Sequence, residues 1–203
     1  MEAILIKLVI LDVDGVLTTG KKYCDREGET KLKSFCDKDW TTIKRFQAIG
    51  IPVIFITGDP YNKKILDNRN LDAYICRSGM FREEFQRDKD MGHYPQDEVV
   101  EVLDKAELLP EICEKYDCSE KEIVYAGDDL LDIGIMRKIN WSFCPHDAPI
   151  IVKDVAYTTL DKAGGDNFVV TLFEHLEALQ LIPTYSFDEV IEKIYELDAK
   201  EKF

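Results

Sequence analysis

Three continuous apolar runs, rich in β-branched residues, dominate the hydrophobic pattern of the chain. They span residues 3–13, 51–57 and 122–127, and they end at Asp, Thr-Gly and Gly-Asp-Asp, respectively. Continuous runs of this length are typical of strands that are covered on both faces. The pattern therefore predicts three buried strands with polar residues at their carboxyl ends.

The apolar spacing between and after these runs is that of helices. Residues 39–50 and 104–117 place apolar side chains three or four positions apart, and residues 129–139 continue from the third run. Gly50 is suited to end the first of these helices, while Pro110 needs an early-turn position or a kink in the second. Alternating strands and helices predict an α/β fold, a doubly wound Rossmann-like parallel sheet in a three-layer sandwich.

Three further segments lie outside this alternation. Residues 20–35 contain two short alternating stretches around a turn, which predicts a β-hairpin flap after the first strand. Residues 77–96 are polar and weakly periodic, so we expect an inserted loop or short helix. Residues 184–203 predict an acidic amphipathic C-terminal helix and tail. We expect one domain over residues 1–183, without a large cap domain, followed by that helix.

Composition and charge narrow the possible partners. The chain has 203 residues and a formal net charge of −14, which disfavours nucleic acid because phosphate backbones are bound through clustered Lys and Arg. We find no apolar run of membrane-spanning length and no leader-like N-terminus, so we expect a cytoplasmic protein without membrane contact. The six cysteines form no C-x-x-C pair, which favours reduced thiols over a zinc site.

Acidic and hydroxyl side chains gather where the predicted strands end. Asp12 and Asp14 follow the first strand, Thr57 ends the second, and Asp128 and Asp129 follow the third. Carboxyl ends of parallel strands meet at one rim of a sheet, so these groups would converge on one site. Close carboxylates repel each other, and oxygen ligands alone favour Mg²⁺ as the neutralising cation. The competing interpretation is that both acidic pairs only cap helices.

Four short motifs resemble those of the haloacid dehalogenase superfamily of phosphatases. DVDGVLTTG at 12–20 resembles its first motif, ITG at 56–58 its second, and GDDLLD at 127–132 its fourth. Lys105, 22 positions before Gly127, is similar to the third-motif lysine. The resemblance implies a phosphatase with the fold predicted above.

Further stretches are similar to one branch of that superfamily. The hairpin, CPHDA at 144–148 and AGGDNFV at 163–169 resemble the capless branch typified by 3-deoxy-D-manno-octulosonate 8-phosphate (KDO 8-phosphate) phosphatase, over most of residues 5–180. This implies a Mg²⁺-dependent phosphomonoester hydrolase for a small phosphorylated metabolite, a sugar or sugar-acid phosphate. It also implies a homo-oligomer, specifically a tetramer, with hairpins packed centrally. Alternatively, the hairpin lysines form a solvated edge, and 77–96 is a local lid.

The resemblance implies roles for the acids in turn. Asp12 would be the nucleophile that forms an aspartyl phosphate, and Asp14 would protonate the leaving alcohol and then activate water. The side chains of Asp12 and Asp128, with the main-chain carbonyl of Asp14, would ligate Mg²⁺. Asp129 and Asp132 would orient these ligands from an outer shell, although Asp132 fits equally well on a helix surface.

The resemblance also implies a phosphate-binding set. Thr57, Gly58 and Lys105 would hold the transferring phosphoryl oxygens, assisted by main-chain N–H groups near Val13 and Gly58. Together with Mg²⁺, these groups would create a positive pocket in a negatively charged protein.

Two positions depart from the branch pattern and leave the substrate open. Where the branch has an arginine after Thr-Gly, this chain has Asp59, which would repel a substrate carboxylate unless Lys63 or Lys64 compensates. Trp40 replaces a glycine, and it either packs on the hairpin or lines the substrate cleft. A nucleotide or acylneuraminate phosphate therefore stays an alternative substrate. A receiver-like phospho-accepting module and a catalytically silent binding protein are the alternatives of other classes.

Overall fold

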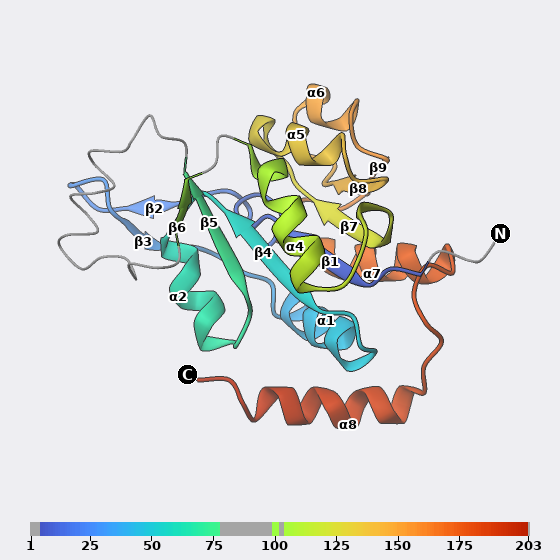
Figure 1. Ribbon diagram of the computed structural model, residues 1–203. Helices are drawn as coiled ribbons and strands as arrows, with labels where there is room; N and C mark the ends of the chain where they lie inside the picture. Colours follow the sequence, from blue (N-terminus) through green and yellow to red (C-terminus); the bar gives the residue numbers. More distant parts are fainter. Residues whose placement is uncertain (1–4, 78–98, 102–103, 203) are drawn as a thin grey trace.

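One parallel sheet forms the centre of the computed structural model, which describes residues 5–77, 99–101 and 104–202 (Figure 1). Its strands are β1 (Leu8–Leu11), β4 (Val53–Thr57), β5 (Ala73–Arg77), β6 (Val99–Glu101), β7 (Ile123–Ala126), β8 (Trp141–Cys144) and β9 (Thr158–Thr159). They lie in the order β6-β5-β4-β1-β7-β8-β9, all paired in parallel. The order reverses between β1 and β7, where open α/β sheets place their ligands.

Helices cover both faces of the sheet. One layer contains α1 (Asp37–Ala48), α2 (Tyr61–Asn68) and α7 (Phe168–Ala178), with α8 (Phe187–Asp198) packed outside α1. The other contains α4 (Leu109–Lys115), α5 (Ile133–Met136) and α6 (Ile150–Lys153). Short 3₁₀ turns lie at Lys105–Leu108, Glu120–Glu122 and Leu130–Asp132.

The central strand shows why the continuous apolar runs are strands. Every residue of β1 is buried, and Val9 and Leu11 pack toward the layer of α1 and α7. Leu8 and Ile10 pack toward the layer of α4 and α5. A strand covered on both faces needs apolar side chains at every position. The predicted doubly wound α/β sandwich is confirmed.

The predicted helices differ in detail from those observed. The helix expected over 104–117 is divided into a 3₁₀ turn and α4. Pro110 therefore lies in the first turn of α4, where its missing N–H removes no hydrogen bond within the helix. The helix expected over 129–139 is likewise a 3₁₀ turn followed by the short α5. Both turns follow an aspartate that caps them, so local side-chain capping interrupts the periodic pattern.

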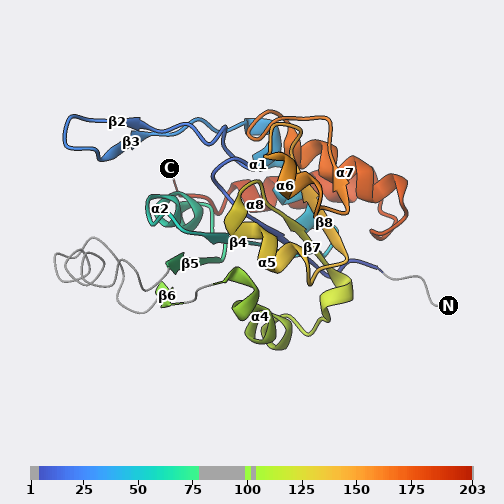
Figure 2. The same ribbon diagram turned by 90° about the horizontal axis from the view of Figure 1, so that it is seen from above.

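The predicted hairpin projects from the sandwich as a separate two-stranded sheet (Figure 2). Its strands are β2 (Tyr23–Cys24) and β3 (Thr30–Leu32), paired antiparallel. The Asp25 carboxylate accepts hydrogen bonds from the main-chain N–H groups of Glu27 and Glu29 and shapes the turn. The insertion expected at 77–96 lies outside the described residues, apart from Arg77 at the end of β5.

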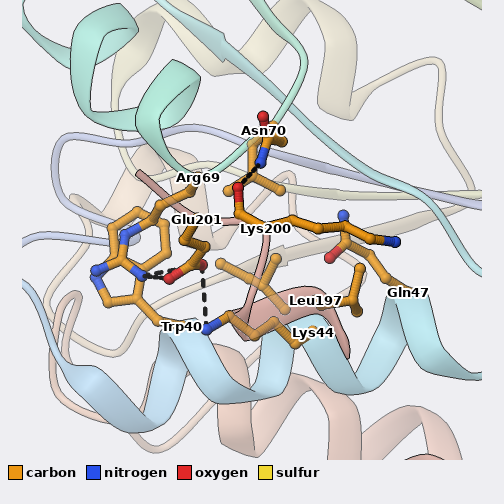
Figure 3. Close-up of a pocket in the computed structure, with 10 residues that line it drawn as sticks. Trp40, Lys44, Gln47, Arg69, Asn70, Leu197, Lys200 and Glu201 are labelled. Carbon is orange, nitrogen blue, oxygen red and sulfur yellow. Dashed lines mark hydrogen bonds and ion pairs between the residues drawn. The ribbon is translucent and has the colours of Figure 1, made fainter. Parts of the chain in front are cut away.

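The residues after α8 contact α1 and the end of α2 (Figure 3). The Glu201 carboxylate accepts from Arg69 at 3.0 and 3.2 Å and lies 3.1 Å from Lys44 Nζ. The Arg69 guanidinium lies 4.2 Å over the ring of Trp40, and that ring also contacts Phe35 at the base of the hairpin. Trp40 therefore packs beneath the hairpin and does not line the acidic pocket described below.

The structure also bears on the expected reduced thiols and on the expected lack of membrane-spanning segments. All six cysteines are free thiols. Within the described ranges, we find no helix with the length and apolar character needed to cross a membrane.

Candidate active site

A pocket of about 560 Å³ opens at the carboxyl ends of β1, β4 and β7. The predicted convergence of distant segments is therefore present in space. Six aspartates line it: Asp12, Asp14, Asp59, Asp128, Asp129 and Asp132. Thr57, Gly58 and Lys105 line it as well, so every predicted site side chain lies at this rim.

Lys105 connects two of the acids at the base of the pocket. Its Nζ lies 3.0 Å from Asp12 Oδ1 and donates to Asp132 Oδ1 at 2.6 Å. The capping carboxylate of Asp104 starts the 3₁₀ turn that carries Lys105 to this point. Burial lowers the pKa of Lys105, but Asp12 and Asp132 outweigh burial and raise that pKa above its ordinary value. The ammonium therefore stays charged in a buried position.

Asp132 is a fully buried carboxylate with four donors. Besides Lys105, the Tyr125 hydroxyl donates to its Oδ1 at 2.6 Å. Its Oδ2 accepts from the main-chain N–H groups of Asp128 and Asp129, both at 2.9 Å. The alternative that Asp132 lies on a helix surface is wrong, because none of its surface is exposed. It instead orients the loop that presents Asp128, whereas Asp129 is exposed and caps the following turn.

Three carboxylates at the base can hold a cation. Oxygens of Asp12, Asp128 and Asp132 lie within 4.8 Å of one another. Asp128 Oδ1 is buried and has no hydrogen-bond partner in the part of the chain that the structure describes. An unpaired buried oxygen beside further carboxylates fits a hard divalent cation, which prefers oxygen ligands.

The surroundings of Asp12 and Asp128 disfavour the ionised form of both side chains. Burial raises the pKa of Asp12 to about 7; Lys105 lowers that pKa and Asp132 raises it. Burial, with Asp12 and Asp132 nearby, raises the pKa of Asp128 to about 8. A cation would favour the ionised forms of both acids.

Gly15 lets the Asp128 carboxylate approach the first loop closely. Its φ is +93°, and a Cβ at this position would lie 2.0 Å from Asp128 Oδ2. A larger residue would therefore displace Asp128 and strain the backbone. The glycine of the first motif is needed both for the turn and for the position of an acid more than a hundred residues away.

Asp14 lies against the hairpin and outside the three-acid cluster. Lys33 Nζ donates to its two oxygens at 2.7 and 2.8 Å, and Asn62 Nδ2 donates to Oδ2 at 3.2 Å. The Thr18 hydroxyl is 3.4 Å from Oδ1. Asp14 thus borders the pocket while its carboxylate is held by two residues from other elements.

The Thr57 hydroxyl is oriented by its neighbours at the end of β4. Its Oγ1 accepts from Asn62 Nδ2 at 2.8 Å and from the main-chain N–H of Asp59 at 3.2 Å. With both interactions on the oxygen, the hydroxyl proton can point elsewhere. Thr57 is therefore suited to donate a hydrogen bond to a ligand oxygen in the pocket.

Asp59 is bound by two lysines of the hairpin, which the sequence pattern did not indicate. Lys22 and Lys33 from the hairpin donate to its Oδ2 at 2.7 and 2.8 Å, whereas Lys63 pairs with Asp67 along α2. Although burial raises the pKa of Asp59, these two lysines lower it to about 2.

Four residues of the site were missed in the sequence: Lys22, Lys33, Asn62 and Tyr125. The hairpin lysines resembled a solvated edge, and Asn62 and Tyr125 lie in ordinary helix and strand patterns. The one sequence feature that indicated them was the excess of acids at the rim, because close carboxylates need nearby positive charge.

The chain is similar to several known proteins. No family model matches its sequence. The KDO 8-phosphate phosphatase KdsC of Salmonella typhi is 31% identical over 161 residues, which cover 79% of this chain and 73% of the relative. A cobalt-bound KDO 8-phosphate phosphatase structure from Haemophilus influenzae has a TM-score of 0.68 at 24% identity, covering 86% of this chain and 90% of the other. The Moraxella catarrhalis phosphatase with magnesium, phosphate and KDO has a TM-score of 0.60 at 22% identity, covering 96% and 90%.

A divalent cation held by these acids should stabilise the protein more at pH 8 than at pH 6. The pKa values of Asp12 and Asp128, about 7 and about 8, are raised above those of an unfolded chain. The stability due to these protonated carboxyls is therefore present at low pH and lost as pH rises through 7 and 8. Over the same range, protons compete less with the cation.

The measurement is the Mg²⁺-induced rise in Tm, which we expect to be roughly twofold larger at pH 8. In Asp128→Asn both the rise and its pH dependence should shrink. Equal rises at the two pH values in the native sequence would contradict this electrostatic account.

Gly15→Ala should weaken Mg²⁺ binding by at least about tenfold, because the added Cβ displaces Asp128. Gly28→Ala is the matched control, since Gly28 has a φ of +86° but open space at its Cβ position. Calorimetric titration with Mg²⁺ compares the variants after thermal melts establish that both fold. The same affinity in both would show that Asp128 does not depend on Gly15.

Proposed function

This chain belongs to the KDO 8-phosphate phosphatase family of the haloacid dehalogenase superfamily, and on that premise we propose that it hydrolyses a small sugar phosphate with Mg²⁺ through an aspartyl phosphate on Asp12. Family membership makes it a phosphoric monoester hydrolase. The observation that carries the proposal is the position of Asp12, 3.0 Å from Lys105 and beside the unpaired oxygen of Asp128.

Asp12 is the proposed nucleophile. The Asp12 side chain is 10% exposed at the end of β1, and Lys105 Nζ lies 3.0 Å from one of its oxygens. A carboxylate oxygen attacks phosphorus, forming an O–P bond as the bond from phosphorus to the leaving oxygen breaks. Water then attacks the same phosphorus and releases phosphate, which restores Asp12.

Asp14 is the proposed acid and base. It gives its proton to the leaving alcohol oxygen in the first step, because an alkoxide is a poor leaving group. In the second step it takes a proton from the attacking water, so both protons are accounted for. Asn62 and Lys33 hold the carboxylate at the border of the pocket.

The phosphoryl oxygens are bound by groups from three segments. Lys105 supplies positive charge at the base, the Thr57 hydroxyl donates from the end of β4, and main-chain N–H groups near Val13 and Gly58 complete the set. Donors placed before the substrate arrives stabilise the transferring group without rearrangement.

A divalent cation fits the acids at the base, and we propose Mg²⁺. Asp12 and Asp128 would hold it with the main-chain carbonyl of Asp14, while Asp132 orients the Asp128 loop from behind. Asp129, exposed at the same rim, is proposed as an outer-shell acid. When bound, the cation neutralises charge on the phosphate and on the acids. Metal-containing relatives support this: one related structure contains cobalt and another contains magnesium with phosphate.

The proposed catalytic unit covers residues 1–183, and the proposed assembly is a cytoplasmic homotetramer that packs through the hairpins. Tyr23 and Leu32 are paired across the hairpin and are 63% and 65% exposed, which supports a contact there. The free thiols are consistent with a reducing compartment.

Asp12→Asn should reduce kcat for 4-nitrophenyl phosphate by at least about a thousandfold, because the amide is a poor nucleophile. Phosphate release is measured with Mg²⁺, after EDTA, and after Mg²⁺ is restored; only the EDTA sample of the native sequence should be inactive. Asp188→Asn, on the exposed face of α8, is the control. If Asp12→Asn and Asp188→Asn turned over equally, Asp12 would not be the nucleophile.

A further inference from the structure

The mouth of the pocket carries charges that phosphate hydrolysis does not require. Lys22 of the hairpin and Asp59 of the loop between β4 and α2 line it, and Lys33 of the hairpin contacts Asp59 from a buried position. The side chain of Lys33 is completely buried and that of Lys22 is 38% exposed, while that of Asp59 is 17% exposed. Ammonium groups at the mouth of a phosphatase would normally suggest a second anionic group on the substrate.

Both ammonium groups are, however, already matched by carboxylates of the chain. Lys33 Nζ has three N–H bonds and four acceptors within reach: both oxygens of Asp14, Asp59 Oδ2 and, at 2.7 Å, Asn62 Oδ1. Lys22 donates to Asp59 Oδ2 at 2.7 Å and lies 3.6 Å from Asp14. Lys22 and Lys33 are therefore already engaged with carboxyl groups of the chain, and both of them contact Asp59.

The other described residues of the pocket do not offer positive charge for a second anion. Among the described residues that line it, six are aspartates and only Lys22 and Lys105 are lysines. Lys105 and the proposed cation act at the base, where the phosphoryl group is expected. A carboxylate further out would meet the Asp59 carboxylate, whose two lysines are already engaged, and like charges at such distances repel strongly.

Asp59 and Lys22 can, in contrast, form hydrogen bonds with the hydroxyl groups of a sugar. A carboxylate has about four lone-pair positions, and Asp59 Oδ1 is occupied by the main-chain N–H of Tyr61 at 3.0 Å, which leaves capacity for a sugar O–H. Lys22 lines the pocket and can rotate a donor toward a sugar oxygen. Alternating acceptors and donors are the chemistry that recognises a polyol.

We propose that Asp59 makes this enzyme selective for phosphate esters of neutral, hydroxyl-rich sugars and excludes sugar acids that carry a carboxylate. This inference rests on the proposed phosphatase function and selects one part of its substrate class. Asp59 is a specificity-determining residue that acts on the leaving group, not on the phosphoryl group.

The test compares sorbitol 6-phosphate with 6-phosphogluconate, which differ only in a terminal CH₂OH or carboxylate. The native sequence should have a kcat/KM at least tenfold higher for sorbitol 6-phosphate. Asp59→Asn, which removes the repelling charge and keeps the acceptor oxygen, should reduce that ratio at least tenfold, mainly through a lower KM for 6-phosphogluconate. Asp67→Asn, on the outer part of α2 where Asp67 pairs with Lys63, should keep the native ratio.

A native preference for 6-phosphogluconate, or an unchanged ratio in Asp59→Asn, would overturn the inference and leave the phosphatase assignment intact. 4-Nitrophenyl phosphate, which has neither a carboxylate nor a sugar hydroxyl, separates the two proposals. If the native protein with Mg²⁺ hydrolyses neither 4-nitrophenyl phosphate nor either of the two sugar esters, the phosphatase proposal fails, and this inference fails with it. The comparison within the native sequence holds even if Asp59→Asn does not fold.

Discussion

The fully buried carboxylate of Asp132 is the constraint on which the site depends. It joins the lysine before α4, the hydroxyl of Tyr125 on β7 and the main-chain N–H groups of the loop after β7. A buried carboxylate without such donors would destabilise the fold by several kcal/mol, on the order of a broken buried ion pair. Because the four donors satisfy Asp132 together, they also fix where Lys105 and Asp128 stand relative to Asp12.

Charge balance is arranged locally in a chain that is strongly acidic as a whole. At the base of the pocket, Lys105 offsets part of the charge of Asp12 and Asp132, and a divalent cation would offset the remainder. At the mouth, two lysines of the hairpin contact the carboxyl groups of Asp14 and Asp59. The hairpin is therefore more than a flap, because it delivers the cations that hold the proposed acid and base in place.

Much of this architecture follows from local pattern. Apolar runs ending in polar residues located three of the central strands, and the parallel topology brought Asp12, Thr57 and Asp128 to one rim as expected. The neighbours of Asp59 could not be obtained in this way, since a hairpin folds back at an angle that sequence spacing does not encode. Lys22 and Lys33 lie 26 or more positions before Asp59 in the chain, and only tertiary folding places them beside it. Sequence pattern thus located the proposed reacting groups better than the groups that position them.

The most direct test of the account is to locate the covalent phosphate. Protein turning over a sugar phosphate with Mg²⁺ is quenched rapidly and reduced with borohydride, which converts a phosphorylated aspartate to homoserine, and the peptides are sequenced by mass spectrometry. The account predicts homoserine at position 12, dependent on substrate and Mg²⁺. Two results would contradict the account in protein that turns over substrate. One is homoserine at another aspartate. The other is the absence of homoserine at position 12 both in the first turnover and in the steady state.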